Sequence, residues 1–118
     1  MDMVQVIIGG DIVPTKSNLE LFNNGDIEAL IGSGLIDLLS GCDIRIFNLE
    51  VPLADQAAPI HKCGPCLIAP TSTARGLKAL DPSLIALANN HILDQGEQGL
   101  KSTVAVLQEN GIAYVGAG

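Results

Sequence analysis

The 118-residue chain is long enough for one domain, or part of one, that buries about two-thirds of its unfolded surface. Hydrophobic residues make up 47% of the chain and aromatic residues only 3%, so the core must be aliphatic. No apolar run approaches the ~20 residues of a membrane span. Thirteen acidic residues against six basic ones give a net charge of −7, which argues against nucleic-acid binding and suits carboxylates gathered around a cation.

Residues 3–9 (MVQVIIG) are rich in β-forming side chains and predict the first strand. Met1-Asp2-Met3 leads straight into this run, so no signal peptide opens the chain, and the compartment of the protein is left undetermined. Gly9 and Gly10 are expected to end the strand, which places Asp11 at its carboxyl end. Asp11 alone is equally consistent with bonding to turn amides.

Residues 15–34 are polar and interrupted by glycine, so we expect short helical pieces at best. Residues 35–40 (LIDLLS) can close one or two helical turns before a stop at Gly41. Residues 43–49 (DIRIFNL) alternate polar and apolar side chains, as a second strand would. Glu50 then falls at the carboxyl end of that strand, where a lone glutamate is more often solvated than functional.

A long loop, residues 54–70, contains the string Cys63-Gly64-Pro65-Cys66. The string is similar to the redox motif of thioredoxin, which needs a strand before the first cysteine and a helix start at it. Neither is predicted here, since a proline follows within four positions. The pair is also half of a zinc site, but Cys42 and His61 make a poor remainder. A loop or structural role is favoured, with thiol redox chemistry and metal binding as alternatives, and three cysteines leave at least one thiol without an internal partner.

Residues 71–80 (TSTARGLKAL) predict a helix whose N-cap is Thr71 or Ser72. Asp81-Pro82 breaks this helix. The apolar run 83–88 then predicts a buried third strand.

Two side-chain amides, an imidazole and a carboxylate follow that strand, within residues 89–94 (NNHILD). Residues 98–110 form the next predicted helix, with one apolar stripe and a stop at Asn110-Gly111. Residues 112–115 (IAYV) predict a fourth strand. The polar cluster therefore occupies the turn between a strand and a helix.

The element order βαβαβαβ, without an internal repeat, predicts an α/β fold with a mostly parallel sheet flanked by helices. Short aliphatic strands of this kind are typical of sheets covered on both faces. All strand ends would meet at one edge, together with Asp11, Glu50 and residues 89–91. Ligands bind at this edge in open α/β sheets, so it is the predicted functional site.

Aspartate, glutamate, asparagine and histidine supply the oxygen and nitrogen ligands that suit Mn²⁺, Fe, Mg²⁺ or Zn²⁺. Two such cations ~3.5–4 Å apart can clamp a phosphoryl group and activate a bridging water. An imidazole can either bind the metal or protonate the leaving oxygen. No P-loop or GxGxxG motif follows the first strand, and no serine or cysteine occupies a nucleophile elbow, so nucleotide-binding and nucleophilic-triad chemistry are disfavoured.

Three blocks carry a family resemblance: Gly10-Asp11, Asn48-Leu49-Glu50, and LANNHILDQGEQGL (residues 87–100) followed by GIAYVGAG. Together they resemble the bacterial capsule-synthesis family (CapA-like, poly-γ-glutamate biosynthesis), which is related to the calcineurin-like metallophosphoesterases. The resemblance extends along essentially the whole chain, and its third block is the most specific. It implies a metal-dependent phosphoesterase-type hydrolase, if the protein is an enzyme at all.

The resemblance also implies roles for individual residues. Asp11 matches the first metal-binding aspartate, Glu50 matches the bridging acidic ligand, and Asn90 matches the amide ligand. His91 matches the metal-binding or proton-donating histidine, and Asp94 is placed to orient it. The implied cofactor is one or more divalent metal ions, with Mn, Fe, Mg and Zn as candidates.

Two departures bear on these expectations. Val13 stands where phosphoesterases have a histidine, and His61 and His91 are the only histidines in the sequence. We therefore expect residues 1–118 to form a single, truncated domain, the N-terminal portion of the family's domain, which binds metal weakly and catalyses little. Its exposed sheet edge or helix face would favour a homodimer, for example by edge-strand pairing.

The expected partners are the capsule or polyglutamate synthesis machinery, without nucleic acid, and with membrane association only through parts not in this chain. An alternative function is a non-catalytic assembly or binding module of the same synthesis and export machinery. A thiol redox protein acting through Cys63 and Cys66 is a third, less favoured function.

Overall fold

A computed structural model describes residues 2–117 of the chain. Its strands, β1 to β4, form one sheet in the order β1-β2-β3-β4, and every neighbouring pair is parallel. The predicted α/β class is confirmed. The elements are β1 (Val6–Ile12), α1 (Leu19–Asn24), α2 (Ile27–Ser40), β2 (Ile44–Leu49), the 3₁₀ turn η1 (Thr71–Thr73), α3 (Ala74–Ala79), β3 (Leu84–Ala86), α4 (Gly96–Glu109) and β4 (Tyr114–Val115).

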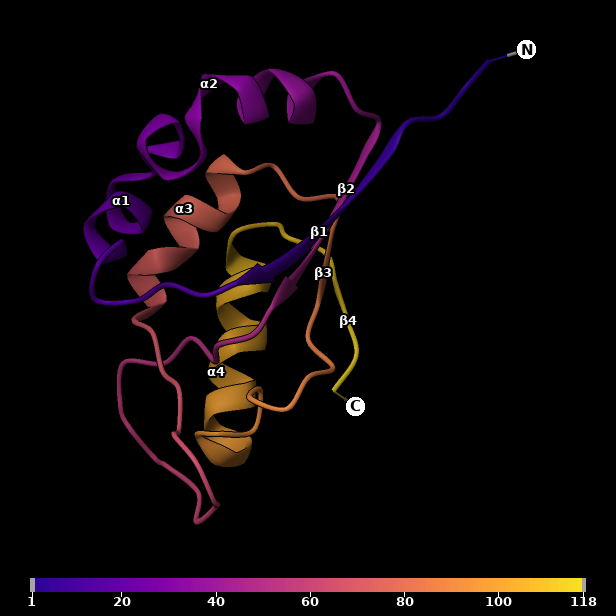
Figure 1. Ribbon diagram of the computed structural model, residues 1–118. Helices are drawn as coiled ribbons and strands as arrows, with labels where there is room; N and C mark the ends of the chain where they lie inside the picture. Colours follow the sequence, from indigo (N-terminus) through magenta and orange to yellow (C-terminus); the bar gives the residue numbers. More distant parts are fainter. Residues whose placement is uncertain (1, 118) are drawn as a thin grey trace.

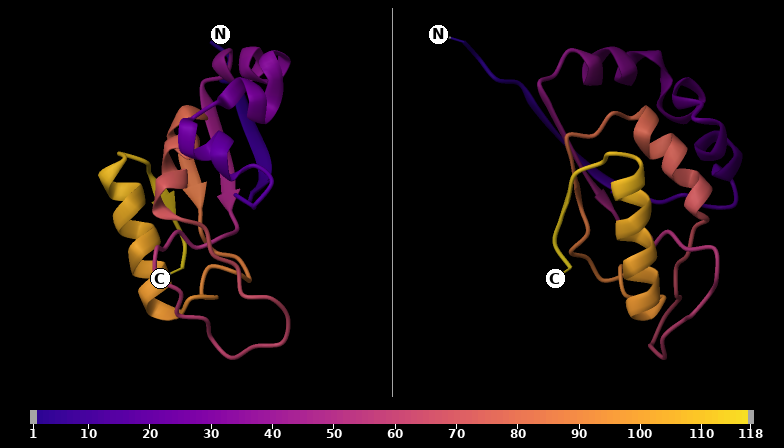
Figure 2. Two further views of the ribbon diagram at one scale, coloured as in Figure 1. Left: turned by 90° about the vertical axis from the view of Figure 1, so that its left-hand side faces the viewer. Right: turned by 180° about the vertical axis from the view of Figure 1, so that it is seen from behind.

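All four α-helices lie on the same side of the sheet (Figures 1 and 2). The reason is topological: each crossover moves to the next strand in the same direction, and crossovers of one hand then put every helix on one face. The core fills the space between that face and the helices. Its buried members include Phe47, Leu49, Ile85 and Leu87 from the sheet side and Phe22, Leu77 and Leu107 from the helices.

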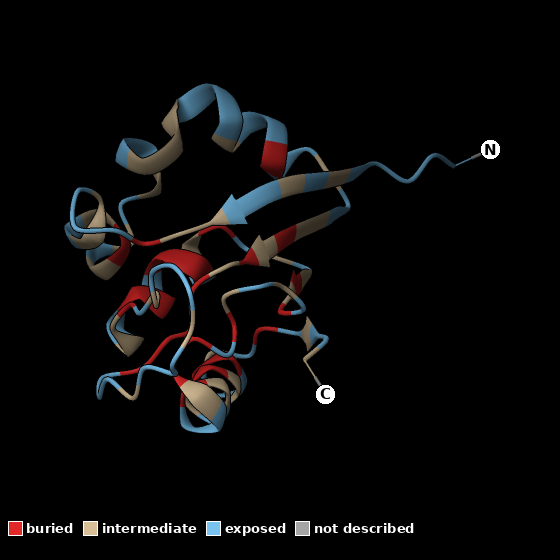
Figure 3. Cartoon of the chain, turned by 60° about the horizontal axis from the view of Figure 1, so that its bottom comes forward, coloured by how far each residue is buried: buried red, intermediate tan, exposed pale blue. Residues whose placement is uncertain are grey.

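The opposite face of the sheet has no covering layer within residues 2–117. Val6, Ile8, Ile44 and Val115 are exposed there, and Ile8 retains 76% of its accessible surface. Figure 3 shows β1 as largely exposed along its length. The expectation that both faces would be covered is therefore wrong for the described residues, because aliphatic strand composition does not report strand order.

The first strand begins and ends later than predicted. It continues through Gly9 and Gly10, and its register with β2 shifts between Ile8 and Asp11. A Cβ on Gly9 would lie 2.5 Å from Cδ1 of Phe47, so the glycine permits a close approach inside the strand instead of ending it. Asp11 consequently lies within β1, one residue before its end, and pairs with Asn48.

Helix occupies more of residues 15–34 than predicted. Gly25 ends α1 with a left-handed φ of 65°, and the side chain of Asp26 then accepts from the amide of Ala29 to begin α2. Gly32, with φ of 82°, kinks α2 between its two segments. The glycines and aspartate of this stretch separate helices instead of preventing them.

The predicted N-caps of the third helix are also wrong. Thr71 and Ser72 lie in η1, ahead of α3, and no side-chain cap bond is present there. The Thr71 hydroxyl donates to Asp55, and the Ser72 hydroxyl donates to Asn23. Both side chains hold neighbouring segments together.

Among the described residues, no helix has the length and apolar character needed to cross a bilayer.

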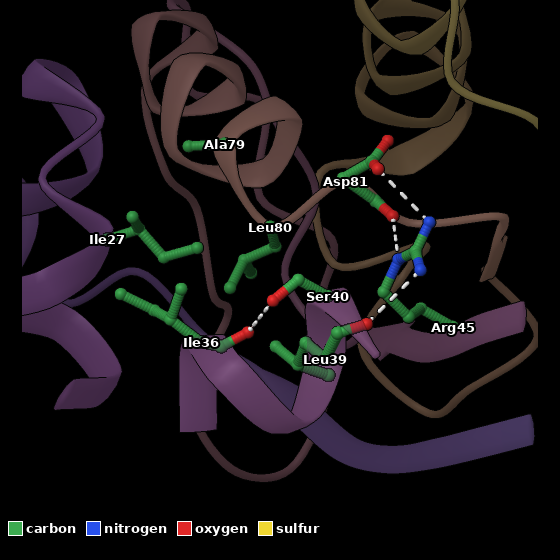
Figure 4. Close-up of a pocket in the computed structure, with 8 residues that line it drawn as sticks. All are labelled: Ile27, Ile36, Leu39, Ser40, Arg45, Ala79, Leu80 and Asp81. Atoms are coloured by element: carbon green, nitrogen blue, oxygen red, sulfur yellow. Dashed lines mark hydrogen bonds and ion pairs between the residues drawn. The ribbon is translucent and has the colours of Figure 1, made fainter. Parts of the chain in front are cut away.

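Arg45, near the start of β2, lies at the amino-terminal end of the sheet, opposite the predicted site. Figure 4 shows its side chain beside Asp81 and Leu39. Its guanidinium donates to the carbonyls of Leu39 and Cys42, to the carbonyl of Asp81 and to the Asp81 carboxylate. These bonds tie the end of α2 and the segment after α3 to β2, and the Leu39 carbonyl also accepts from the amide of Cys42. The adjoining cavity, about 100 Å³ and lined mainly by aliphatic side chains, lies where α2, β2 and the end of α3 meet.

Candidate functional site

The predicted site residues lie at one edge of the sheet, because parallel strands bring their carboxyl ends together. Asp11 is near the end of β1, Glu50 directly follows β2, and Asn90 and His91 lie in the turn between β3 and α4. Asp11 and Asn90 are exposed, whereas Glu50 and His91 are half-buried. Solvent therefore reaches every one of these four groups.

A line of amide hydrogen bonds ties the ends of the first three strands together. Asn48 Nδ2 donates to Asp11 Oδ1 over 2.7 Å, and Asn89 Nδ2 donates to Asn48 Oδ1 over 3.1 Å. Asn89 Nδ2 also donates to the carbonyl of Leu49 over 2.8 Å. Sequence reasoning assigned no role to Asn48 or to this use of Asn89. The only available signal was that both are polar residues next to a strand end.

Asn89 also shapes the turn that carries His91. Its Oδ1 accepts from the backbone amides of His91 and Ile92, each over 3.0 Å. An asparagine bonded to amides two and three residues ahead forms a turn of the Asx type, which fixes the local backbone. The position of the His91 backbone is therefore set from the strand side by Asn89.

The ring of His91 is held on one side and open on the other. Its Nδ1 lies 2.6 Å from Oδ2 of Asp94, and its Nε2 lies 3.9 Å from Oε1 of Glu50. A carboxylate can only accept, so in the neutral imidazole the proton belongs on Nδ1 and the lone pair of Nε2 faces Glu50. This is the tautomer in which Nε2 can bind a metal or receive a proton.

Asp94 is buried and has partners on both oxygens. Lys62 Nζ donates to Oδ1 over 2.6 Å, and the amide of Leu67 donates to Oδ2 over 2.6 Å. Burial by itself raises the pKa of the Asp94 carboxyl, but the bonds from Leu67, Lys62 and His91 outweigh it and lower the pKa below its usual value. Asp94 is consequently ionised at neutral pH, and an ionised carboxylate accepts from Nδ1–H of His91.

The predicted metal ligands Asp11, Glu50, Asn90 and His91 share an edge without forming a complete ligand set. Glu50 and His91 offer one oxygen and one nitrogen donor side by side. The Asp11 carboxylate is bonded to Asn48. Within residues 2–117, no group of three or more histidine, cysteine, aspartate or glutamate side chains is arranged to hold a metal ion. The donor chemistry fits a divalent cation, and the number of converging donors is too small to enclose one.

The sequence model of the bacterial capsule synthesis protein family PGA_cap matches residues 5–118. The chain belongs to this family. The resemblance drawn from the strand-end blocks is thereby confirmed.

Two of three curated relatives of this PGA_cap chain carry names that refer to polymer or capsule synthesis. It is 42% identical over 76 residues to a probable polyglutamine synthesis accessory protein of Mycobacterium tuberculosis, covering 64% of this chain and 20% of that protein. It is 30% identical over 123 aligned positions to an uncharacterized protein of Sinorhizobium fredii, covering 100% of this chain and 25% of that protein. The capsule biosynthesis protein CapA of Bacillus anthracis is 38% identical over 52 residues, 44% of this chain and 13% of CapA. The chain thus spans a quarter or less of the length of these relatives.

The loop 54–70 of this family member extends past the carboxyl ends of the strands (Figure 1). Cys63 is exposed, and the thiol of Cys66 donates to the carbonyl of Ile60 over 3.4 Å. The loop has neither a strand before Cys63 nor a helix after it. The setting that the thioredoxin mechanism requires is absent from this loop. Cys42 precedes β2 at the other end of the sheet, so it does not extend the pair toward a zinc site.

Proposed function

We propose that this chain contributes to a metal-dependent phosphoesterase-type site of a protein that acts in capsule or poly-γ-glutamate synthesis. One observation carries the proposal: the buried Asp94 carboxylate holds Nδ1 of His91, and Nε2 is presented toward Glu50 at the carboxyl ends of parallel strands. Membership of the PGA_cap family supports the biological setting. The names of the Mycobacterium and Bacillus relatives support it further.

In this proposal, Glu50 and His91 are the first pair of metal ligands, and the exposed Asp11 and Asn90 add oxygen donors from the same edge. The remaining donors come from outside this chain, since the relatives are much longer than the part it matches. A bound divalent cation would polarise a phosphoryl oxygen and lower the pKa of a bound water. His91, with Nε2 open, either completes the ligand set or carries the proton to the leaving oxygen.

A specific observation favours a second function, a non-catalytic assembly or binding module. Position 13, where the phosphoesterase pattern has a histidine, is Val13, and the described residues hold no three-ligand cluster. A protein that retains the strand-end scaffold without a full ligand set could use it to bind a component of the polymer machinery. Metal binding tests the proposed site, and turnover of a phosphodiester separates the two functions.

The test is Mn²⁺ titration by calorimetry, first on this chain and then on the full-length gene product. The compared proteins are the wild type, His91→Ala, Glu50→Gln and the control Glu97→Gln, whose carboxylate is exposed on α4. We expect stoichiometric binding in the full-length protein, a loss of tenfold or more in the two site variants, and no change in the control.

A full-length protein that binds Mn²⁺ equally with and without Glu50 and His91 would overturn the proposed site. Hydrolysis of bis(p-nitrophenyl) phosphate then distinguishes the two functions. Mn²⁺-dependent turnover that is lost in His91→Ala supports the phosphoesterase. Stoichiometric metal without turnover of this or related diesters supports the binding module.

A further inference from the structure

The loop 54–70 is fastened to the turn that carries His91. Asp94 and Gln95, at the end of that turn, are the anchoring points, and both are buried. The bonds are Ile60 N–H to the Asp94 carbonyl, Ala58 N–H to Gln95 Oε1, Gln95 Nε2 to the Leu67 carbonyl, Leu67 N–H to Asp94 Oδ2, and Lys62 Nζ to both Asp94 Oδ1 and the Asn90 carbonyl. A segment without helix or strand thus reaches the site through specific polar contacts.

Lys62 makes two of these contacts from a single charged group. Its Nζ lies 2.6 Å from Asp94 Oδ1 and 3.4 Å from the carbonyl oxygen of Asn90. The Lys62 side chain retains only 22% of its exposure, and the Asp94 side chain retains none. Lys62 therefore bonds both to Asp94, which holds the His91 ring, and to Asn90, which precedes His91 in the chain.

We infer that Lys62 is a positioning residue of this site: it holds Asp94 and the Asn90 backbone so that the Nε2 lone pair of His91 faces Glu50. The two carboxylate oxygens of Asp94 accept from different partners. Oδ2 receives Leu67 N–H and His91 Nδ1, and Oδ1 receives Lys62. Without Lys62, Oδ1 would be a buried charged oxygen without a donor, and the carboxylate would turn toward water and release the ring.

The same geometry argues against a direct role of Lys62 in binding an anionic substrate. Its charge is already paired with a buried carboxylate at 2.6 Å, and most of its side chain is covered. A lysine that binds substrate phosphate would present its ammonium group to solvent. Lys62 acts on the site through Asp94 and Asn90.

The inference rests on the proposed function only in that the proposed chemistry uses His91. Its test is therefore a metal-free measurement, the tautomer of the His91 ring in ¹⁵N–¹H correlation spectra at mildly alkaline pH. The 118-residue chain contains two histidines, so a His61→Gln background leaves the His91 signals alone. In the starting protein we expect the proton on Nδ1 and an unprotonated Nε2.

In Lys62→Met we expect a shift toward the tautomer with the proton on Nε2, the form that predominates in an unrestrained imidazole. Lys62→Arg keeps a cationic donor and should restore the Nδ1–H form. Lys101→Met removes an exposed lysine paired with Glu97 and should leave the spectrum unchanged. If Lys62→Met does not fold, Lys62→Gln, which keeps a neutral donor, should show an intermediate shift.

An unchanged tautomer in folded Lys62→Met or Lys62→Gln would overturn the inference, and so would failure of Lys62→Arg to restore the wild-type spectrum. Mn²⁺ affinity of the same variants in the full-length gene product keeps the two proposals apart. A tautomer shift together with about tenfold weaker Mn²⁺ binding supports both. A tautomer shift with unchanged Mn²⁺ binding supports the positioning role of Lys62 and removes His91 from the proposed ligand set.

Discussion

Thr103 connects the segment after Glu50 to α4, and the cost of breaking this connection can be worked out from the structure. Its side chain is fully buried. Its hydroxyl accepts from the amide of Leu53 over 2.9 Å and donates to the carbonyl of Gly99 over 2.7 Å. Thr103→Val replaces the hydroxyl with a methyl group of similar size, so the buried Leu53 N–H loses its partner.

The expected destabilisation is about 1–3 kcal/mol, the cost of leaving a buried backbone donor unsatisfied. The Gly99 carbonyl adds little, since it can still accept from the helix backbone. Thr103→Ser keeps the hydroxyl and removes one methyl group, which costs about 1 kcal/mol through lost apolar burial. The two expected losses overlap at about 1 kcal/mol and have different causes, so global stability alone does not distinguish the two explanations.

Amide hydrogen exchange at Leu53 distinguishes them. In Thr103→Val, the Leu53 amide should exchange about 10–100-fold faster than in the wild type, relative to amides elsewhere in the core, because a local cost of 1.4 kcal/mol is about tenfold in an opening equilibrium. In Thr103→Ser, its relative protection should be retained. Unchanged Leu53 protection in Thr103→Val, or selective loss of it in Thr103→Ser, would refute this account of how the Glu50 segment is held.

Three further predictions concern the pH response, the packing and the association of the chain. The pKa of Asp94 is lowered in the folded state, so its ionised carboxylate stabilises the fold above the unfolded pKa of about 3.9. This contribution is lost as the pH falls through the folded-state pKa. Urea unfolding at a series of pH values should therefore show a steeper loss of stability in acid for the wild type than for Asp94→Asn. Gly76→Ala should lower the free energy of unfolding by about 1–3 kcal/mol, since its Cβ would come within 3.0 Å of the backbone of α1. Gly34→Ala, whose Cβ would have no neighbour within 4 Å, should be neutral or stabilising. Equal effects of the two variants in urea unfolding would contradict the packing argument. The uncovered apolar face of the sheet, in addition to its exposed edges, should favour the predicted homodimer. In sedimentation equilibrium, Ile8→Glu should therefore shift the protein toward monomer, whereas Leu38→Glu on α2 should not. A wild type that stays monomeric at high concentration would contradict this prediction.

Several features of the fold follow from local sequence pattern. The second strand and the last helix were predicted close to their observed bounds, because period-two alternation and an apolar stripe report which side of a segment is buried. The parallel sheet followed from the element order and the handedness of crossovers. The same rule places Glu50 and His91 at one edge, since the carboxyl ends of parallel strands share an edge whatever the details of packing.

The bounds of β1 and the extent of α1 and α2 could not be predicted from the local sequence pattern, because glycine occurs in strands, helix caps, kinks and loops alike. Gly9 reads as a strand end, and only the approach of Phe47 shows that it lies inside a strand. Gly25 and Gly32 read as loop, and only the backbone angles show a helix cap and a kink. The bare sheet face likewise depends on strand order, which local periodicity does not encode.

The sequence by itself determined the fold class, the family and the edge where the polar groups gather, since these depend on periodicity, element order and short motifs. Only the tertiary structure decided which side chains hold that edge. Lys62 and Asp94 are 32 residues apart, and the loop that carries Lys62 has no pattern that predicts a contact. Asn48 and Asn89 are 41 residues apart, and the strand order brings their segments to one edge without specifying that these two side chains bond. Hydrogen bonds over such separations form only after the sheet has brought distant turns together, so the organisation of the site is a property of the fold.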